Sequence, residues 1–593
     1  MRFFSAFHSR RLSAISWLLF LIIASGAAHA ADETLRLDIS GVEGEMLANV
    51  EAALTIPGGL IQDGRVNRLW LRRYLQQAPE KVRQALQPFG YFKAEAAVKL
   101  KEKEAEQYRL KVEVNPGPAV RITSMDLRLV GAGAKDEALL QQIKDFPLGK
   151  GDRLRQDRYE VGKGQLLATA VDQGYLQASF DKHEIAVTEA DNSAVVSLVL
   201  NTGPLFHFGE VSFPDPPDYP DRFLRRYITF RPGRSFSHAE LGQTQAQLHD
   251  SDRFKDVVIT PRMDEVVDDH QVPIEIRLTP KPSRTLRPGI GYGTDTGPRF
   301  SLRYRDVNVW NLGHEFTVDL LIAQLRQSLD TAYIFPHYKN VDSYTALKAG
   351  FNREDTDTYY TKTTFAEAEL VQKRGKGRLS FYLRWQSEDY EVGDTAEISQ
   401  LLIPGARWSY RTYASPTRPL KGYRLGLEVR GARKEFLSDT SLLQIIAEAN
   451  TLIPLPGRFS LFLRGNGAMT LQQDKFAEIP VSLRFFAGGD QSVRGWGYQT
   501  LGPKDDSGDV VGGKNLAVAS AELEKAIGES WGVAVFYDMG NAFDSLSDYT
   551  LESSAGIGVR WYTLVGPVKV DLARQLSEPS HALRLHVSMG FAW

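Results

Sequence analysis

The sequence predicts a multi-domain protein in which three α+β domains are followed by a transmembrane β-barrel of about sixteen antiparallel strands. Two observations support this fold class. Residues 32–283 repeat a mixed helix and strand pattern with a period of about 80 residues. From residue 284 to residue 593 the helical patterns disappear, and long segments alternate between an apolar face and a small or polar face.

The N-terminal segment has the features of an export signal. Arg10 and Arg11 precede an apolar run that ends in the small-residue pattern Ala28-His29-Ala30. This order is typical of a secretory signal peptide. A membrane anchor is the alternative, but the run is shorter than the roughly 20 residues that a spanning helix needs. We expect residues 1–30 to be removed, so that the mature chain begins at Ala31.

The composition argues against several classes of function. The 73 acidic and 71 basic residues nearly balance, so no overall charge favours nucleic acid as a partner. The chain has no cysteine, which excludes disulfides, thiolate metal sites and a cysteine nucleophile. The histidines are scattered, and the sequence contains no H-E-x-x-H, P-loop or G-x-S-x-G motif. We therefore expect no enzyme activity, no catalytic residue, no metal site and no cofactor.

Each of the three repeats reads as a small domain of the order β-α-α-β-β. A strand pattern opens the repeat, and helical patterns, a tight turn and two alternating strands follow. The turns are marked, in order, by Gly90-Tyr91, Gly174-Tyr175 and Arg253-Phe254. Such a unit forms a mixed sheet that helices cover on one side. We expect the three domains at residues 31–118, 119–203 and 204–283, with the barrel at 284–593.

The edge strands of these small sheets suggest a binding role. An uncovered edge strand presents free N–H and C=O groups, and it can accept an extended peptide as an added strand. The alternative is that the domains are rigid spacers whose edges are protected by charge.

Period-two alternation in the second half favours a membrane barrel. In the segment "WGVAVFYDMG", Trp531, Val533 and Val535 share one face, whereas Ala534 and Asp538 lie on the other. Such strands suit lipid on one side and a polar lumen on the other, and an even number can close. A secreted sandwich or propeller is the alternative, but its strands would average about five or six residues. The segments here look roughly twice that length.

One loop within the barrel region stands out. It extends from about residue 484 to residue 514 and contains the glycine-rich stretch "FFAGGDQSVRGWGYQT" around Arg494. An arginine in a barrel lumen needs a carboxylate partner, because an unpaired charge there is costly. Asp538 lies on the lumen-facing side of its strand, and we expect Glu522 to do so too. The alternative is a surface loop with a solvated arginine.

The order of motifs resembles a known family. The stretch "VRGWGYQ" at Val493–Gln499 is followed by "GGKNLAVASAELE", "VFYDMGNAF", "GIGVRW" and "GPVKVDLA". After three repeats, this order resembles the outer-membrane insertase superfamily, whose repeats are POTRA domains and whose VRG[FYW] loop folds back into the barrel. The resemblance implies a loop lock formed by Val493, Arg494, Gly495 and Trp496 with Asp538, or with Glu522 as second partner.

Within this superfamily, three POTRA domains look like the TamA type, because BamA-type insertases carry five and two-partner secretion transporters carry two. The TamA resemblance implies an outer-membrane protein of a Gram-negative-type cell with periplasmic POTRA domains. It implies a TamB-like partner anchored in the inner membrane, unfolded outer-membrane proteins such as autotransporters as clients, and a role in phospholipid supply to outer-membrane lipids. The alternative is a transporter of the two-partner secretion type that acts through the lumen.

The seam where the barrel closes has weak strand formers. We expect the first strand at about residues 285–295 to pair with the last at about 581–593. A proline lacks an N–H group, and glycines weaken a strand. The seam residues concerned are Pro288, Gly289, Gly291, Gly293, Gly590, Phe591 and Trp593. We therefore predict few ladder hydrogen bonds at this seam and hypothesise that it opens, although small residues there also suit simple packing.

Overall fold

The computed structural model describes most of the chain, in eight segments. These are residues 35–62, 65–103, 107–266, 270–413, 421–472, 476–547, 549–563 and 566–589. The predicted signal peptide at residues 1–30 lies outside them. Among the described residues, no helix is long and apolar enough to cross a membrane.

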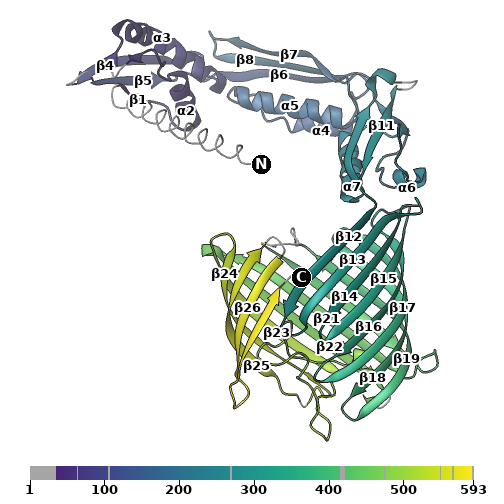
Figure 1. Ribbon diagram of the computed structural model, residues 1–593. Coiled ribbons are helices and arrows are strands. Elements are labelled where there is room, and N and C mark those ends of the chain that lie inside the picture. The colour runs from purple at the N-terminus through teal and green to yellow at the C-terminus, as the bar shows by residue number, and fades with distance from the viewer. Residues whose placement is uncertain are drawn as a thin grey trace, which may run out of the picture. The chain divides into compact units, whose positions relative to one another are not determined.

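The chain forms two compact units (Figure 1). The first contains the first two repeats and part of the third, and the second contains the barrel together with the rest of the third repeat. The third repeat contributes Phe230–Gln243 and Ile259–Glu275 to the first unit, and Phe213–Thr229 and Thr244–Val258 to the second.

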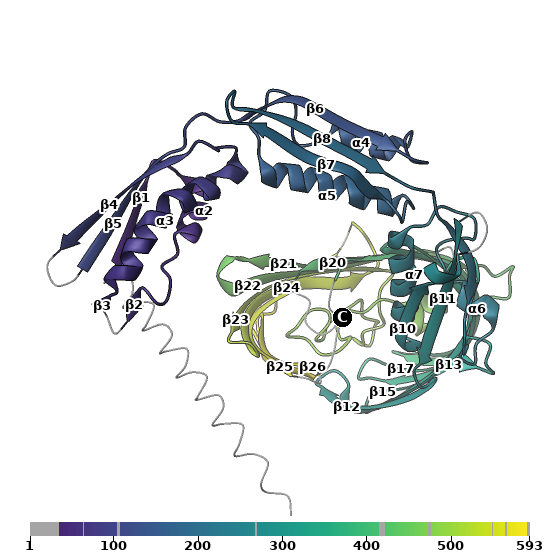
Figure 2. The same cartoon turned by 90° about the horizontal axis from the view of Figure 1, so that it is seen from above.

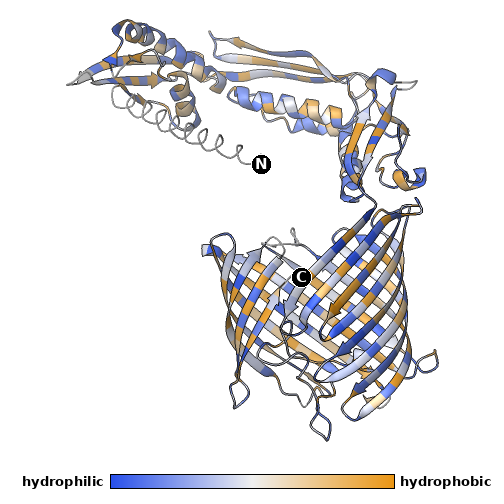
Figure 3. Cartoon of the chain, viewed as in Figure 1, coloured by the Kyte–Doolittle hydropathy of each residue, from blue (hydrophilic) through white to orange (hydrophobic). Residues whose placement is uncertain are grey.

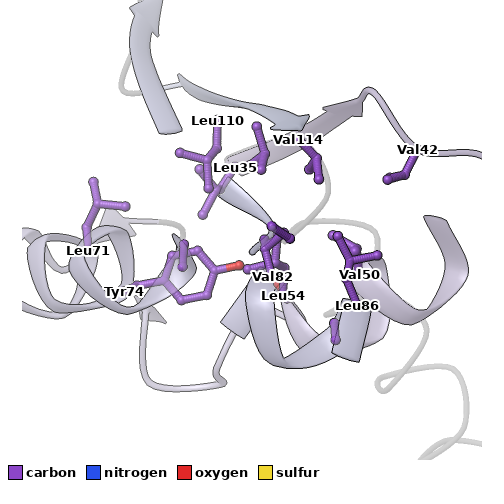
Figure 4. Close-up of a cluster of buried hydrophobic side chains, with 14 of the residues drawn as sticks. Leu35, Val42, Val50, Leu54, Leu71, Tyr74, Val82, Leu86, Leu110 and Val114 are labelled. Atoms are coloured by element: carbon purple, nitrogen blue, oxygen red, sulfur yellow. Dashed lines mark hydrogen bonds between the residues drawn. The ribbon is translucent and has the colours of Figure 1, made fainter. Parts of the chain in front are cut away.

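The first repeat forms a three-stranded sheet with two helices on one face. Its elements are β1 (Leu35–Ser40), α2 (Gly44–Ala53), β2 (Ile61–Gln62), β3 (Arg65–Val66), α3 (Arg68–Leu86), η1 (Gln87–Phe89), β4 (Glu95–Lys103) and β5 (Gln107–Asn115). The sheet order is β1-β5-β4, with β1 parallel to β5 and β4 antiparallel to it. Asn67 caps the N-terminus of helix α3, because its side chain accepts hydrogen bonds from two backbone N–H groups of the first turn. Leu35, Leu54, Tyr74 and Leu110 meet in the core (Figure 4).

The second repeat has the same topology. It comprises β6 (Arg121–Val130), α4 (Glu137–Lys144), α5 (Gln156–Asp172), β7 (Ser179–Thr188) and β8 (Ser193–Asn201), and its sheet order is β6-β8-β7. Gly174 adopts φ +100°, in the left-handed region that favours glycine. A Cβ atom there would lie 3.1 Å from the carbonyl oxygen of Phe206. The turn that the sequence marks as Gly174-Tyr175 therefore requires its glycine.

The third repeat comprises β9 (His207–Ser212), α6 (Asp221–Arg225), α7 (His238–Asp250), β10 (Phe254–Pro261), η2 (Met263–Glu265) and β11 (Gln271–Pro280), with sheet order β10-β11-β9. In its turn the left-handed conformation falls on Asp252, one residue before the Arg253 that replaces glycine. Arg253 is buried, and its guanidinium lies over the ring of Phe223. The order β-α-α-β-β occurs in all three repeats, with the short hairpin β2-β3 between the two helices of the first.

The second half forms a closed antiparallel barrel, as the sequence predicts. Sixteen strands make up the barrel within the described part of the chain. They are β12 (Arg284–Gly293), β13 (Gly297–Val309), β14 (His314–Ala323), β15 (Arg326–Pro336), β16 (Tyr344–Asp355), β17 (Tyr359–Arg374), β18 (Gly377–Val392), β19 (Thr395–Arg411), β20 (Gly422–Ala432), β21 (Leu442–Leu455), β22 (Phe459–Gln472), β23 (Asn515–Ile527), β24 (Trp531–Phe543), β25 (Glu552–Thr563), β26 (Gly566–Gln575) and β27 (Leu583–Met589). A short η4 turn (Pro456–Arg458) joins β21 to β22.

The barrel strands alternate between an apolar outer face and a mixed inner face, which appears as stripes in Figure 3. On β24, Trp531, Val533 and Val535 are exposed, whereas Phe536 and Asp538 are buried. This is the alternation expected from the sequence. An exposed apolar outer face with a buried polar interior is the pattern of a barrel in lipid.

Candidate functional site

The segment between β22 and β23 lies inside the barrel. In the end-on view of Figure 2, coil segments occupy the ring of strands. Ala487, Val493, Trp496 and Leu501 of this loop are buried and pack with Val518 of β23. The loop is thus part of the barrel interior.

The base of the loop is more ordered than its composition suggests. Two 3-10 turns, η5 (Phe476–Glu478) and η6 (Val481–Leu483), precede the glycine-rich stretch. Arg484 holds this base, because its guanidinium donates to the carbonyl oxygens of Ile479, Ala477 and Val511 at 2.8, 3.0 and 3.1 Å. The predicted loop, from about residue 484, therefore begins later than the structural segment, which follows Gln472. This role of Arg484 is not among those predicted from the sequence.

Arg494 is 5% exposed and makes a bidentate contact with Asp538. Its Nε donates to Asp538 Oδ2 at 2.7 Å, and Nη2 donates to Asp538 Oδ1 at 2.9 Å. The backbone N–H of Arg494 also donates to Oδ2, at 3.1 Å. Such a fork of charge-assisted bonds fixes both position and orientation. The guanidinium also lies 3.4 Å from the centre of the Phe536 ring.

Two further carboxylates complete the surroundings of Arg494. Its Nη1 donates to Glu522 Oε2 at 2.8 Å and to Asp571 Oδ2 at 3.0 Å. Glu522 is among the residues that the sequence indicates, whereas Asp571 is not. Asp571 belongs to the motif "GPVKVDLA" and lies on β26, and strand alternation could have placed it on the inner face.

A second buried arginine shares the same carboxylates. Arg560 on β25 donates to Asp571 Oδ1 at 2.5 Å and to Glu522 Oε1 at 2.8 Å. It is fully buried. Gly558 makes room for this arrangement, because a Cβ atom there would collide with the carboxylate of Asp571. The cluster therefore contains two guanidinium groups and three carboxylates, and two of these carboxylates are bound by both arginines. Arg494 is the member of the cluster that belongs to the loop.

The remaining residues of the predicted lock lie around this cluster. Val493 and Trp496 are buried in the small apolar cluster of the loop. Gly495 adopts φ +100°, and its carbonyl oxygen accepts a hydrogen bond from the side chain of Gln575 at 2.8 Å. The loop is therefore fastened to β26 as well as to β24.

The structure describes one end of the seam between β12 and β27. Within residues 284–589, one residue pair is in register, Gly293 with Ser588. On their other sides, all 10 residues of β12 pair with β13, and all 7 described residues of β27 pair with β26. The antiparallel register places the positions opposite Gly291 to Pro288 beyond Met589, outside the described residues. The backbone N–H of Thr294 adds a bond to the carbonyl oxygen of Val587 at 2.9 Å. The predicted seam residues Gly590, Phe591 and Trp593 lie outside the described residues.

The glycines of the first strand also have a packing role. A Cβ atom at Gly289 would lie 2.6 Å from Ser301 Oγ, and one at Gly291 would lie 2.7 Å from Arg299 Nε. Pro288 is in register with Leu302 of β13. These residues accommodate side chains of the neighbouring strand, which is the simple packing that the sequence left open as an alternative.

Comparison with known proteins agrees with this architecture. The Omp85 superfamily domain matches residues 308–593, and the first POTRA domain of the TamA type matches residues 36–116. Among curated relatives, the outer membrane protein assembly factor BamA of Nitratidesulfovibrio vulgaris is 23% identical over 402 residues, which are 62% of this chain and 49% of that protein. The BamA of Neisseria meningitidis serogroup B is 27% identical over 211 residues, 29% of this chain and 26% of that protein.

The chain thus spans half or less of the length of these curated relatives. Among solved structures, BamA from Haemophilus ducreyi lacking POTRA domains 1–3 superimposes with a TM-score of 0.66 at 18% identity, covering 79% of this chain and 99% of that one. That likeness concerns the fold.

The repeats, the closed barrel and the buried loop together define an outer-membrane protein that joins POTRA domains to a β-barrel. Its barrel half matches the Omp85 superfamily domain, and its first repeat matches a POTRA domain of the TamA type.

Proposed function

We propose that the protein inserts β-barrel clients, autotransporters among them, into the outer membrane by opening the seam between β12 and β27. The observation that carries this proposal is the buried loop, which fills the barrel interior and leaves the wall of the barrel, where Gly293 and Ser588 meet, as the route for a client. A backbone group left unpaired in lipid costs several kcal/mol. The exposed edges of an opened seam would therefore favour pairing with a strand of an incoming client.

The buried loop supports insertion over transport through the lumen. Its apolar residues and its arginine cluster fill space inside the barrel. A barrel that is filled in this way should conduct ions poorly and intermittently. A transporter of the two-partner secretion type that acts through the lumen should instead show a stable open pore.

Reconstitution tests this choice. The purified protein is placed in lipid vesicles, and a urea-denatured autotransporter β-domain is added as client. We expect the client to fold faster than in protein-free vesicles, as measured by its shift to the heat-modifiable folded form on gels. No acceleration, together with a stable single-channel conductance, would instead support transport through the lumen.

The proposed partner is a TamB-like protein anchored in the inner membrane, and the proposed route to it is a sheet edge of a POTRA domain. In the first repeat, β4 is an edge strand, and Leu100 on it is exposed. Lys99 and Lys101 lie on the same edge, and charge of this kind also protects edges against unwanted pairing. A photo-crosslinking amino acid at position 100 should capture the partner in cells, and one at the buried position 110 of the central strand should not.

The proposal includes a contribution to phospholipid supply. It is tested apart from client insertion in a strain that lacks this protein. Autotransporter assembly and outer-membrane phospholipid content are measured in the same cells. A loss of the first alone would restrict the role to protein insertion, whereas a loss of both supports the full proposal.

A further inference from the structure

Three side chains of types that can bind a metal ion lie close together where the buried loop contacts both edges of the seam. Asp295 lies in the turn between β12 and β13, Asp490 lies in the loop, and His586 lies on β27. One carboxylate oxygen or ring nitrogen from each residue lies within 4.8 Å of those of the others. Asp295 is 7% exposed and His586 is 2% exposed. Segments far apart in the sequence thus bring two carboxylates and one imidazole together in a buried place.

Hydrogen bonds already connect the three residues. His586 Nδ1 and Asp490 Oδ1 are 2.5 Å apart, and the backbone N–H of Asp490 donates to Asp295 Oδ2 at 2.5 Å. The hydroxyl of Thr294 donates to Asp490 Oδ1 at 3.2 Å. These bonds hold the side chains close together, but they leave one oxygen of the cluster without a partner.

That oxygen is Oδ1 of Asp295. It is buried and has no hydrogen-bond partner among the described residues. The hydroxyl oxygen of the adjacent Thr296 is also buried and without a partner in this part of the chain. A buried carboxylate oxygen without a donor is costly, and buried charges are normally paired or coordinate metals. This oxygen is the independent sign that the cluster is built to receive a cation.

The protonation of His586 follows from its other contact. The backbone N–H of Gly495 donates to His586 Nε2 at 2.9 Å, so Nε2 carries no proton. The proton of the neutral imidazole is then on Nδ1, where it is donated to Asp490. The imidazole adds no positive charge to offset the two carboxylates.

We propose that Asp295, Asp490 and His586 form a binding site for a divalent metal ion that links the buried loop to both edge strands of the seam. Two carboxylate oxygens and one imidazole nitrogen suit Zn²⁺ or Mn²⁺, with water in the remaining positions. The metal takes the place of the proton between His586 Nδ1 and Asp490. The imidazole stays neutral by carrying its proton on Nε2 instead.

Metal binding has a structural consequence. An Nε2 that carries a proton no longer accepts the N–H group of Gly495, so that bond is exchanged for the metal bridge. The bridge joins the turn after β12 to β27, and it would hold this end of the seam closed. The site itself does not depend on the proposed insertion function, because metal binding can be measured on the isolated protein.

Calorimetric titration tests the proposal. Untagged full-length protein in detergent is freed of metal with a chelator and titrated with ZnCl₂, and separately with MnCl₂. We expect one ion to bind per chain, and the affinity to fall at least tenfold in Asp295→Asn. Asp506→Asn is the control, because Asp506 is an exposed carboxylate of the same loop, and it should bind as the unchanged protein does. Absence of binding to the unchanged protein, or equal affinity in Asp295→Asn, would overturn the proposal.

A second measurement covers the case in which Asp295→Asn does not fold, which heat-modifiability on gels reveals. Co²⁺ is then bound to the unchanged protein, and X-ray absorption is used to identify its ligands. We expect a shell of oxygen and nitrogen atoms with the scattering pattern of one imidazole. A shell without imidazole would overturn the site.

Discussion

At the scale of single residues, the Arg494 cluster is where the loop depends most on charge. Arg494 and Arg560 share Glu522 and Asp571, and of these two arginines Arg494 is the one that binds Asp538. Removing one member of a buried ion cluster leaves uncompensated charge, at a cost of about 3–5 kcal/mol. Because Arg494 comes from the loop, its loss should release the loop while the strands remain paired.

The first prediction follows for Arg494→Ala. Client assembly in the reconstituted system should fall strongly, whereas the barrel should still show heat-modifiable mobility on gels. The loop should also become accessible to protease. Arg433→Ala, at an exposed arginine paired with Glu435, is the control and should behave as the unchanged protein does. Wild-type assembly with Arg494→Ala would show that the contact has no role in function.

The second prediction concerns Gly558. A methyl group there would collide with the Asp571 carboxylate, and no charge would be added or removed. We expect Gly558→Ala to displace Asp571 and to increase protease cleavage within the loop. Gly465→Ala is the control and should leave cleavage unchanged, because a Cβ atom at Gly465 meets open space and its backbone suits alanine. Gly528→Ala is less suitable, because the φ of Gly528 is positive. If Gly558→Ala leaves cleavage unchanged, Asp571 does not hold the loop.

Strand alternation explains how much of this site the sequence could predict. It placed Asp538 on the lumen side, and the need of a buried arginine for a carboxylate suggested the pairing with Arg494. It could not select Asp571 or Arg560, because the register between neighbouring strands decides which inner residues meet. The convergence of Asp295, Asp490 and His586 depends on closure of the barrel, which no local pattern contains.

At the scale of elements, the first two repeats are joined by a specific contact. Arg155, at the start of α5, donates to Glu45 of α2 at 2.7 Å, and its guanidinium lies 4.9 Å from the centre of the Phe89 ring. Arg153 donates to the hydroxyl of Tyr91 at 2.9 Å. These side-chain contacts join the first repeat to the second, in addition to the short chain segment between β5 and β6.

The third prediction is that Arg155→Ala loosens this joint. The isolated first and second repeats should show a wider spread of relative orientations by small-angle X-ray scattering, with little change in the melting of either domain. Arg158→Ala, on the exposed side of α5, is the matched control. An unchanged scattering profile in Arg155→Ala would contradict a role for this arginine in the joint.

The fourth prediction concerns the pH dependence of the pair that Arg155 forms with Asp157 beside this joint. The hydrogen bond from Arg155 lowers the pKa of Asp157 to about 2. A carboxyl group whose pKa is lowered on folding adds stability above its unfolded pKa of about 3.9, and loses it as the pH falls through the folded value. The contribution of this pair should therefore be constant at neutral pH and should disappear between about pH 4 and pH 2. Thermal melting of the two-repeat fragment across this range, compared with Asp157→Asn, measures it.

The elements themselves were largely predictable, because each follows from a local pattern. Glycine marks the turn at Gly174, where φ is positive, and alternation marks the barrel strands. The third turn shows the limit of such reasoning. Asp252 takes the left-handed conformation, and the Arg253 that follows serves packing against Phe223, a contact that the sequence pattern does not contain.

At the scale of the whole barrel, the central claim is that the seam between β12 and β27 opens during function. In the described residues these two strands meet at the register pair Gly293 and Ser588. The glycines of β12 that suggested weakness also accommodate Ser301 and Arg299. Their presence alone therefore does not distinguish a weak seam from ordinary packing, and a direct test of opening is needed.

A disulfide across the seam provides that test, because the chain has no cysteine of its own. Gly293→Cys and Ser588→Cys, at the register pair, are combined, and client assembly is measured in vesicles under oxidising and reducing conditions. Val535→Cys with Ile557→Cys, a register pair of β24 and β25, is the control and should have no effect. We predict that oxidation of the seam pair abolishes client assembly and that reduction restores it. Full assembly by the oxidised, crosslinked protein would contradict opening of the seam.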